Sequence, residues 1–131
     1  MKKLTLFAGA AALALCPVLA APAFADVNAE VTIAQTHAGL ASKQSAIDGV
    51  HMHLHHAINC LVGPKGNGFD ASQANPCAKA GNGAIPDSTD AAQKAKLMEA
   101  VASAKAGIAA TDLAAAKADA EKTTATLASA K

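Results

Sequence analysis

The chain has 131 residues, no arginine and a formal net charge of +1, so it lacks the basic patch and arginine forks that typify nucleic-acid-binding proteins. Aromatic residues make up only 2% of the chain and alanine is abundant, so a core buries little apolar area per residue. We therefore expect one small domain that is stabilised by something besides its core.

Residues 1–25 have the pattern of a secretory signal peptide. Met1-Lys2-Lys3 is a positively charged start, residues 4–14 are apolar, and Ala23-Phe24-Ala25 is a small-residue cleavage motif. Cleavage after Ala25 removes two lysines and leaves a chain with a net charge of −1. No later apolar run is long enough to span a bilayer, so the sequence predicts an exported protein, periplasmic or secreted.

Residues 27–62 form the first predicted helical arm. Their apolar side chains recur at intervals of three, four and seven residues, which places them on one face of a helix. These residues are Ile33, Leu40, Ile47, Val50, Leu54, Ile58 and Leu61. Gly39 is the weak point within this arm, and Gly63-Pro64 ends it.

Residues 63–88 form a loop rich in Gly, Pro and Asn, and two cysteines, one before the loop and one within it, predict a disulfide. Cys60 and Cys77 are the only cysteines after the signal peptide, and exported proteins keep such pairs oxidised. A Cys60–Cys77 bond closes a loop of 16 intervening residues, which stabilises the fold by about 3 kcal/mol in a chain-entropy model. The alternative is a thiolate metal ligand, because His56 and Cys60 are four residues apart on the helix.

Residues 89–129 form the second predicted helical arm. Residues 87–90 offer N-cap candidates, Gly107 weakens the helical pattern, and Thr111-Asp112 offers a cap for a restart of the helix. We interpret its lysines as a solvated helix face; they are Lys94, Lys96, Lys105, Lys117 and Lys122.

The fold class predicted is all-α. The two arms predict an antiparallel helical hairpin or a small three- or four-helix bundle, with a long disulfide-stapled loop, in a single domain over residues 26–131. A lone hairpin would expose much of its apolar stripe and would form a homodimer through its arms.

The histidine segment at residues 51–56 carries the main functional signal. It reads His51-Met52-His53-Leu54-His55-His56 and holds four of the five histidines. Neutral imidazole is a common ligand of Cu and Zn, and thioether sulfur suits Cu(I). The segment therefore favours a transition-metal site.

Helical spacing divides these side chains between two faces. His51 and His55 share one face, so we expect them to be the main ligands, supported by Asp48 and by His37 four turns earlier on the same line. His53, His56 and Met52 lie on another side and are secondary candidates. One helix cannot bring all four histidines of the segment to one ion. Either two sites exist, or a second chain or a partner helix completes one; Met98, Glu99 and the acids Asp87 and Asp90 are candidates from the second arm.

Three functions follow from these patterns. The first is a non-enzymatic exported protein that binds Cu or Zn for buffering, carriage or sensing; no G-x-S-x-G, H-E-x-x-H or P-loop motif points to catalysis. The second is a structural or partner-binding protein of the cell envelope whose histidines are incidental. The third is a non-covalent haem binder, which the shortage of aromatic and bulky apolar residues disfavours; the absence of C-x-x-C-H excludes covalent c-type haem. A pH sensor is a further alternative, because imidazole titrates near neutrality.

Overall fold

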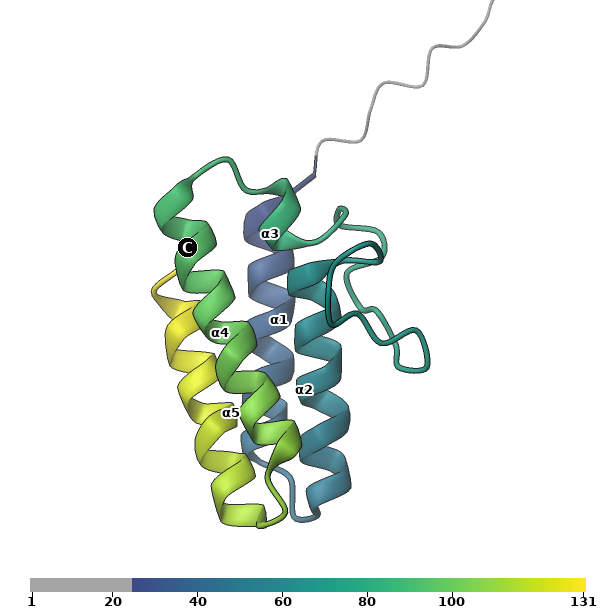
Figure 1. The fold of residues 1–131 in the computed structure, drawn as a ribbon, viewed down its shortest axis with the longest axis vertical. Coiled ribbons are helices and arrows are strands. Elements are labelled where there is room, and N and C mark those ends of the chain that lie inside the picture. Colours follow the sequence, from purple (N-terminus) through teal and green to yellow (C-terminus); the bar gives the residue numbers. More distant parts are fainter. Residues whose placement is uncertain (1–24) are drawn as a thin grey trace, which may run out of the picture.

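The computed structural model describes residues 25–131, and the predicted signal peptide lies almost wholly outside the described residues. Four long helices run side by side, and a long loop projects beside the second of them (Figure 1). The elements in chain order are α1 (Val27–Ser42), α2 (Ile47–Val62), the short α3 (Ala84–Asp87), α4 (Ala91–Ala109) and α5 (Leu113–Ala128). The described residues contain no strand, so the all-α prediction is confirmed in the form of a small helical bundle.

Aspartates begin three of the long helices. The side chains of Asp26, Asp90 and Asp112 each accept a hydrogen bond of 2.9 Å from a backbone N–H in the first turn of the helix that follows. Such caps satisfy donors that have no partner within the helix. The predicted restart near Thr111-Asp112 is confirmed, and Asp90 is the N-cap among the candidates at residues 87–90.

The first arm is not one helix, and its break does not lie at Gly39. Gly39 is inside α1, whereas residues 43–46 form the turn and Ala46 is extended, with φ −129° and ψ 144°. A single glycine costs a helix only about 1 kcal/mol, so packing overrides it. The turn coincides instead with the polar stretch 42–45, which interrupts the apolar stripe. The turn reverses the chain and lays α1 beside α2.

Each long helix packs on at least two others, and α2 also contacts α5 across the bundle. α1 lies against α2 and α5, and α4 lies against α5 and α2. The core combines a few large side chains with many fully buried alanines; the largest are Leu54, Ile58, Leu61, Leu97 and Leu127. Because alanine is small, the helices approach closely. The apolar stripes are therefore buried within one chain, as in a compact bundle and unlike a lone hairpin.

The predicted Cys60–Cys77 disulfide is confirmed. It joins the last turn of α2 to the loop, with Cα atoms 5.1 Å apart and both cysteines buried. The rival assignment of Cys60 as a thiolate metal ligand is therefore wrong for this structure. Within residues 25–131, no helix combines the length and the apolar character needed to cross a membrane.

Candidate metal centre

Three histidines from two helices come together at the α1–α2 contact. His37 projects from α1, and His53 and His56 project from α2, where a spacing of three residues puts them on one face. We call these three residues the His cluster. His37 lies six residues before the turn at residues 43–46 and His53 lies seven residues after it, so the antiparallel register places them opposite each other.

The rings of the His cluster are in direct contact. The Nδ1 atoms of His37 and His53 are 3.3 Å apart. The ring centroid of His56 lies 5.1 Å from that of His37 and 5.7 Å from that of His53, and both pairs meet edge to face. One nitrogen from each ring lies within 4.8 Å of the other two, and all three residues are partly buried.

The environment favours neutral imidazole at two of the three positions. Burial lowers the pKa of His37 below its ordinary 6.5, and the charges that His56 and His53 can carry lower it further. Burial likewise lowers the pKa of His56, with smaller effects from His53 and His55. Metal ligation requires the unprotonated ring, so these shifts prepare the nitrogens for a cation.

One nitrogen of the cluster lacks any partner. His56 Nδ1 is buried and makes no hydrogen bond with the described residues. A buried polar atom without a partner costs about 1–3 kcal/mol, so it normally has a function or a ligand. This atom therefore marks the cluster as chemically incomplete.

The spacing of the nitrogens fits a tetrahedral ion. Zinc binds imidazole nitrogen at about 2.0–2.1 Å, which puts two ligands of a tetrahedral site about 3.3 Å apart. The His37–His53 separation, which is also within hydrogen-bonding range, matches that value, and one nitrogen of His56 lies within 4.8 Å of a nitrogen of each of the other two rings. Three imidazoles leave one tetrahedral position for water or another donor.

The structure does not place the predicted main ligands in this group. His51 Nε2 donates a hydrogen bond of 3.1 Å to the Ala110 carbonyl in the α4–α5 turn. Asp48 is exposed in the first turn of α2, and Met52 is 40% exposed on the same helix. Among residues 25–131, the His cluster is the only group of three or more His, Cys, Asp or Glu side chains close enough to hold an ion.

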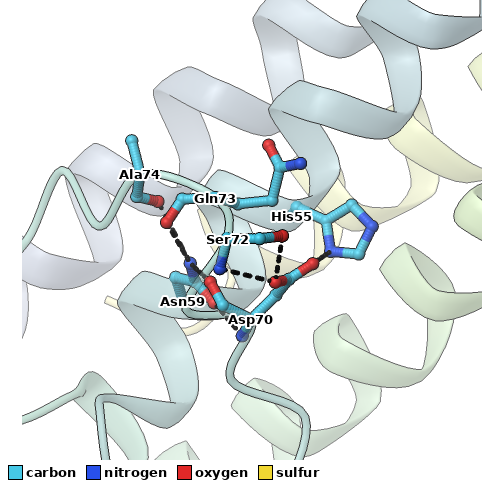
Figure 2. A network of polar contacts seen from close by, with 6 residues as sticks. All are labelled: His55, Asn59, Asp70, Ser72, Gln73 and Ala74. Atoms are coloured by element: carbon cyan, nitrogen blue, oxygen red, sulfur yellow. Dashed lines mark hydrogen bonds and ion pairs between the residues drawn. The ribbon is translucent and has the colours of Figure 1, made fainter.

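His55 faces the loop. Its Nδ1 lies 3.5 Å from Asp70 Oδ2 (Figure 2). Hydrogen bonds from the Ser72 side chain and backbone lower the pKa of Asp70, and the charge of His55 adds to that effect. His55 therefore anchors a loop carboxylate instead of joining the His cluster.

The supporting role expected for His37 also changes. Sequence reasoning put His37 on one continuous helix, in line with His51, but the turn at residues 43–46 makes it a residue of the partner helix α1. A partner helix was expected to complete the site, and α1 does so instead of the second arm. The antiparallel register about a polar turn is the sequence signal that would have paired His37 with His53.

Comparisons of the chain with protein-family models, with curated proteins and with solved structures found no match. Assignment of a function therefore depends on the geometry of the His cluster.

Proposed function

We propose that the protein is an exported, non-enzymatic metal binder that holds one Cu or Zn ion in the His cluster. Three imidazole nitrogens without a thiolate or thioether among them suit Zn(II) and Cu(II) better than Cu(I). The observation that carries the proposal is that one nitrogen from each of His37, His53 and His56 lies within 4.8 Å of the other two, with the His37 and His53 Nδ1 atoms 3.3 Å apart.

The position of the site favours exchange of the ion. All three histidines are partly exposed, so a cation can enter without unfolding of the bundle. A fourth coordination position open to solvent lets a second donor approach before the ion leaves. Buffering or carriage is consistent with such a site, whereas a closed four-ligand site is typical of structural zinc.

The signal-peptide pattern and the disulfide support export. The cleavage motif ends at Ala25, two residues before α1 begins. The Cys60–Cys77 bond is typical of an oxidising compartment such as the periplasm or the extracellular space.

Titration of the oxidised protein with Zn(II), Cu(II) and Cu(I), with the mass measured under native conditions, tests the proposal. We expect one tightly bound equivalent. Single alanine substitutions of His37, His53 or His56 should weaken binding by more than about tenfold, the loss seen even for supporting residues of metal sites. The matched control is the double variant His51→Ala/His55→Ala, which removes two histidines outside the cluster.

The same series separates the alternatives. Loss of binding only in the control variant would move the site to His51 and His55 and contradict the proposal. Binding that is substoichiometric or only millimolar in the unmodified protein would favour the structural or partner-binding role. A Soret band on the purified protein would indicate haem.

A further inference from the structure

A groove runs along α4, away from the residues of the His cluster. It has a volume of about 790 Å3 and is bounded by α4, by α3 and by the loop that follows α2. That volume is within the range of small-molecule sites. None of its lining residues belongs to the His cluster.

One face of α4 forms the length of the groove. Lys94, Met98, Val101 and Lys105 line it and recur at intervals of four, three and four residues, so they share that face. Lys94 and Lys105 are eleven residues apart, which corresponds to about 16 Å along a helix. The groove is therefore elongated.

The middle of the groove is apolar. Val62 of α2 and Ile85 of α3 line it together with Val101 and Met98. Met98 is 61% exposed, more than any other large apolar side chain among residues 25–131. An exposed methionine between packed aliphatic side chains provides an adaptable apolar contact.

The charged side chains that line the groove are all positive. Lys65, Lys94 and Lys105 line it, and none of its lining residues is acidic. Within the described part of the chain, these three ammonium groups make neither an ion pair nor a hydrogen bond. Lys105 reaches the loop, because a Cβ on Gly68 would lie 3.1 Å from its Nζ. The chain after the signal peptide has a net charge of −1, so this positive rim is local and attracts anions to the groove.

We propose that the groove binds a small organic anion with an elongated apolar body, of the alkyl-carboxylate class. The apolar floor takes the hydrocarbon chain, and the lysines at the rim take the carboxylate. An inorganic anion would leave the floor unused, and a cationic amphiphile would face three like charges. Two of these lysines were interpreted from the sequence as a solvated face, because the loop and α3 that complete the groove are remote in sequence.

Titration with decanoate tests this proposal on the full protein with ¹³C-labelled methionine methyl groups. We expect the Met98 methyl resonance to shift, while Met52, exposed on α2, serves as an internal reference and stays in place. Acetate lacks the apolar body and decyltrimethylammonium lacks the negative charge, so neither should shift the Met98 resonance at the same concentration.

Charge removal provides the second readout. The variant Lys94→Gln/Lys105→Gln should bind decanoate roughly 3- to 30-fold more weakly, the sum expected for two exposed ionic contacts. The control Lys79→Gln/Lys122→Gln removes two exposed lysines outside the groove and should bind within about twofold of the unmodified protein. All four lysines are at or near the surface, and circular dichroism confirms that each variant is folded.

Four results would overturn the proposal. They are an unmoved Met98 resonance, equal shifts of both methionine resonances, equal losses in the two lysine variants, or decyltrimethylammonium binding as well as decanoate. Zinc titration of the same samples is independent of these outcomes, because the groove and the His cluster share no residue.

Discussion

Asn59 fastens the long loop to α2, and its replacement should cost a large part of the stability of the domain. Its amide nitrogen donates to the backbone carbonyls of Asp70 at 2.9 Å and Ala74 at 3.1 Å, and its Oδ1 accepts from the Asp70 N–H at 2.9 Å (Figure 2). The contact to the Gln73 carbonyl is longer, at 3.4 Å. Asn59 is fully buried, so water cannot replace these bonds.

The magnitude follows from counting the bonds that an alanine would lose. Three hydrogen bonds at about 1 kcal/mol each give about 3 kcal/mol for Asn59→Ala. Domains of this size have a total free energy of unfolding of about 5–15 kcal/mol, so the loss is severe. It corresponds to a fall in Tm of about 12–24 °C.

Urea and thermal unfolding of the oxidised protein, followed by circular dichroism, measure this loss. Asn59→Asp is the sharper variant, because it keeps the acceptor for the Asp70 N–H but points a carboxylate oxygen at backbone carbonyls. It should be at least as unstable as Asn59→Ala. Ser72→Ala removes an exposed hydroxyl from the same network and should cost less than about 1 kcal/mol. A loss of under 1 kcal/mol in both Asn59 variants would show that these side-chain hydrogen bonds do not hold the loop.

Three further predictions concern pH and packing. Burial, with Asp87 and Asp26 nearby, raises the pKa of Glu30 in the folded protein. The contribution of Glu30 to stability is therefore fully present below its unfolded-state pKa of about 4.5 and is lost as the pH rises through its folded-state pKa. Glu30→Gln should therefore unfold at higher urea concentration than the unmodified protein at pH 7 and at the same concentration at pH 4. Gly107→Ala places a Cβ 2.6 Å from a methyl carbon of Leu54, so it should lower the free energy of unfolding in urea by about 1–3 kcal/mol. Gly39→Ala meets no atom within 4 Å and should raise the free energy of unfolding by up to about 1 kcal/mol. Because the pKa values of His37 and His56 are lowered, acid should weaken zinc binding, measured by competition, less near pH 6.5 than it would for three ordinary imidazoles; a loss as large as three ordinary imidazoles give would contradict this.

Much of the fold was accessible from local sequence signals. Aspartate caps and helical periodicity act within a few residues, so they predicted the starts of α4 and α5, and the even cysteine count predicted the disulfide without any geometry because only one pairing was possible. The turn at residues 43–46 was not predicted, because the sequence indicated Gly39 as the weak point of the first arm, although it lies inside α1. A glycine weakens a helix locally, but packing of the whole apolar face decides where the helix ends.

The candidate site was accessible only in part, for a related reason. Spacing along one helix shows which side chains share a face, and it correctly separated His53 and His56 from His51 and His55. It does not show which face meets another helix. That depends on the direction of the chain after the turn, which brought His37 of α1 to His53 of α2.

The geometry of α2 explains why four histidines in six residues do not mean four ligands. Successive side chains on a helix are about 100° apart, so a run of histidines must point around the helix. His51 reaches the α4–α5 turn and His55 reaches the loop, while His53 and His56 face α1. The first contact joins α2 to a turn remote in sequence and the second joins it to the loop that follows α2, so those rings have structural partners without a metal. The two remaining rings need His37 to complete three ligands, which predicts one bound ion instead of the two that the sequence alone would allow.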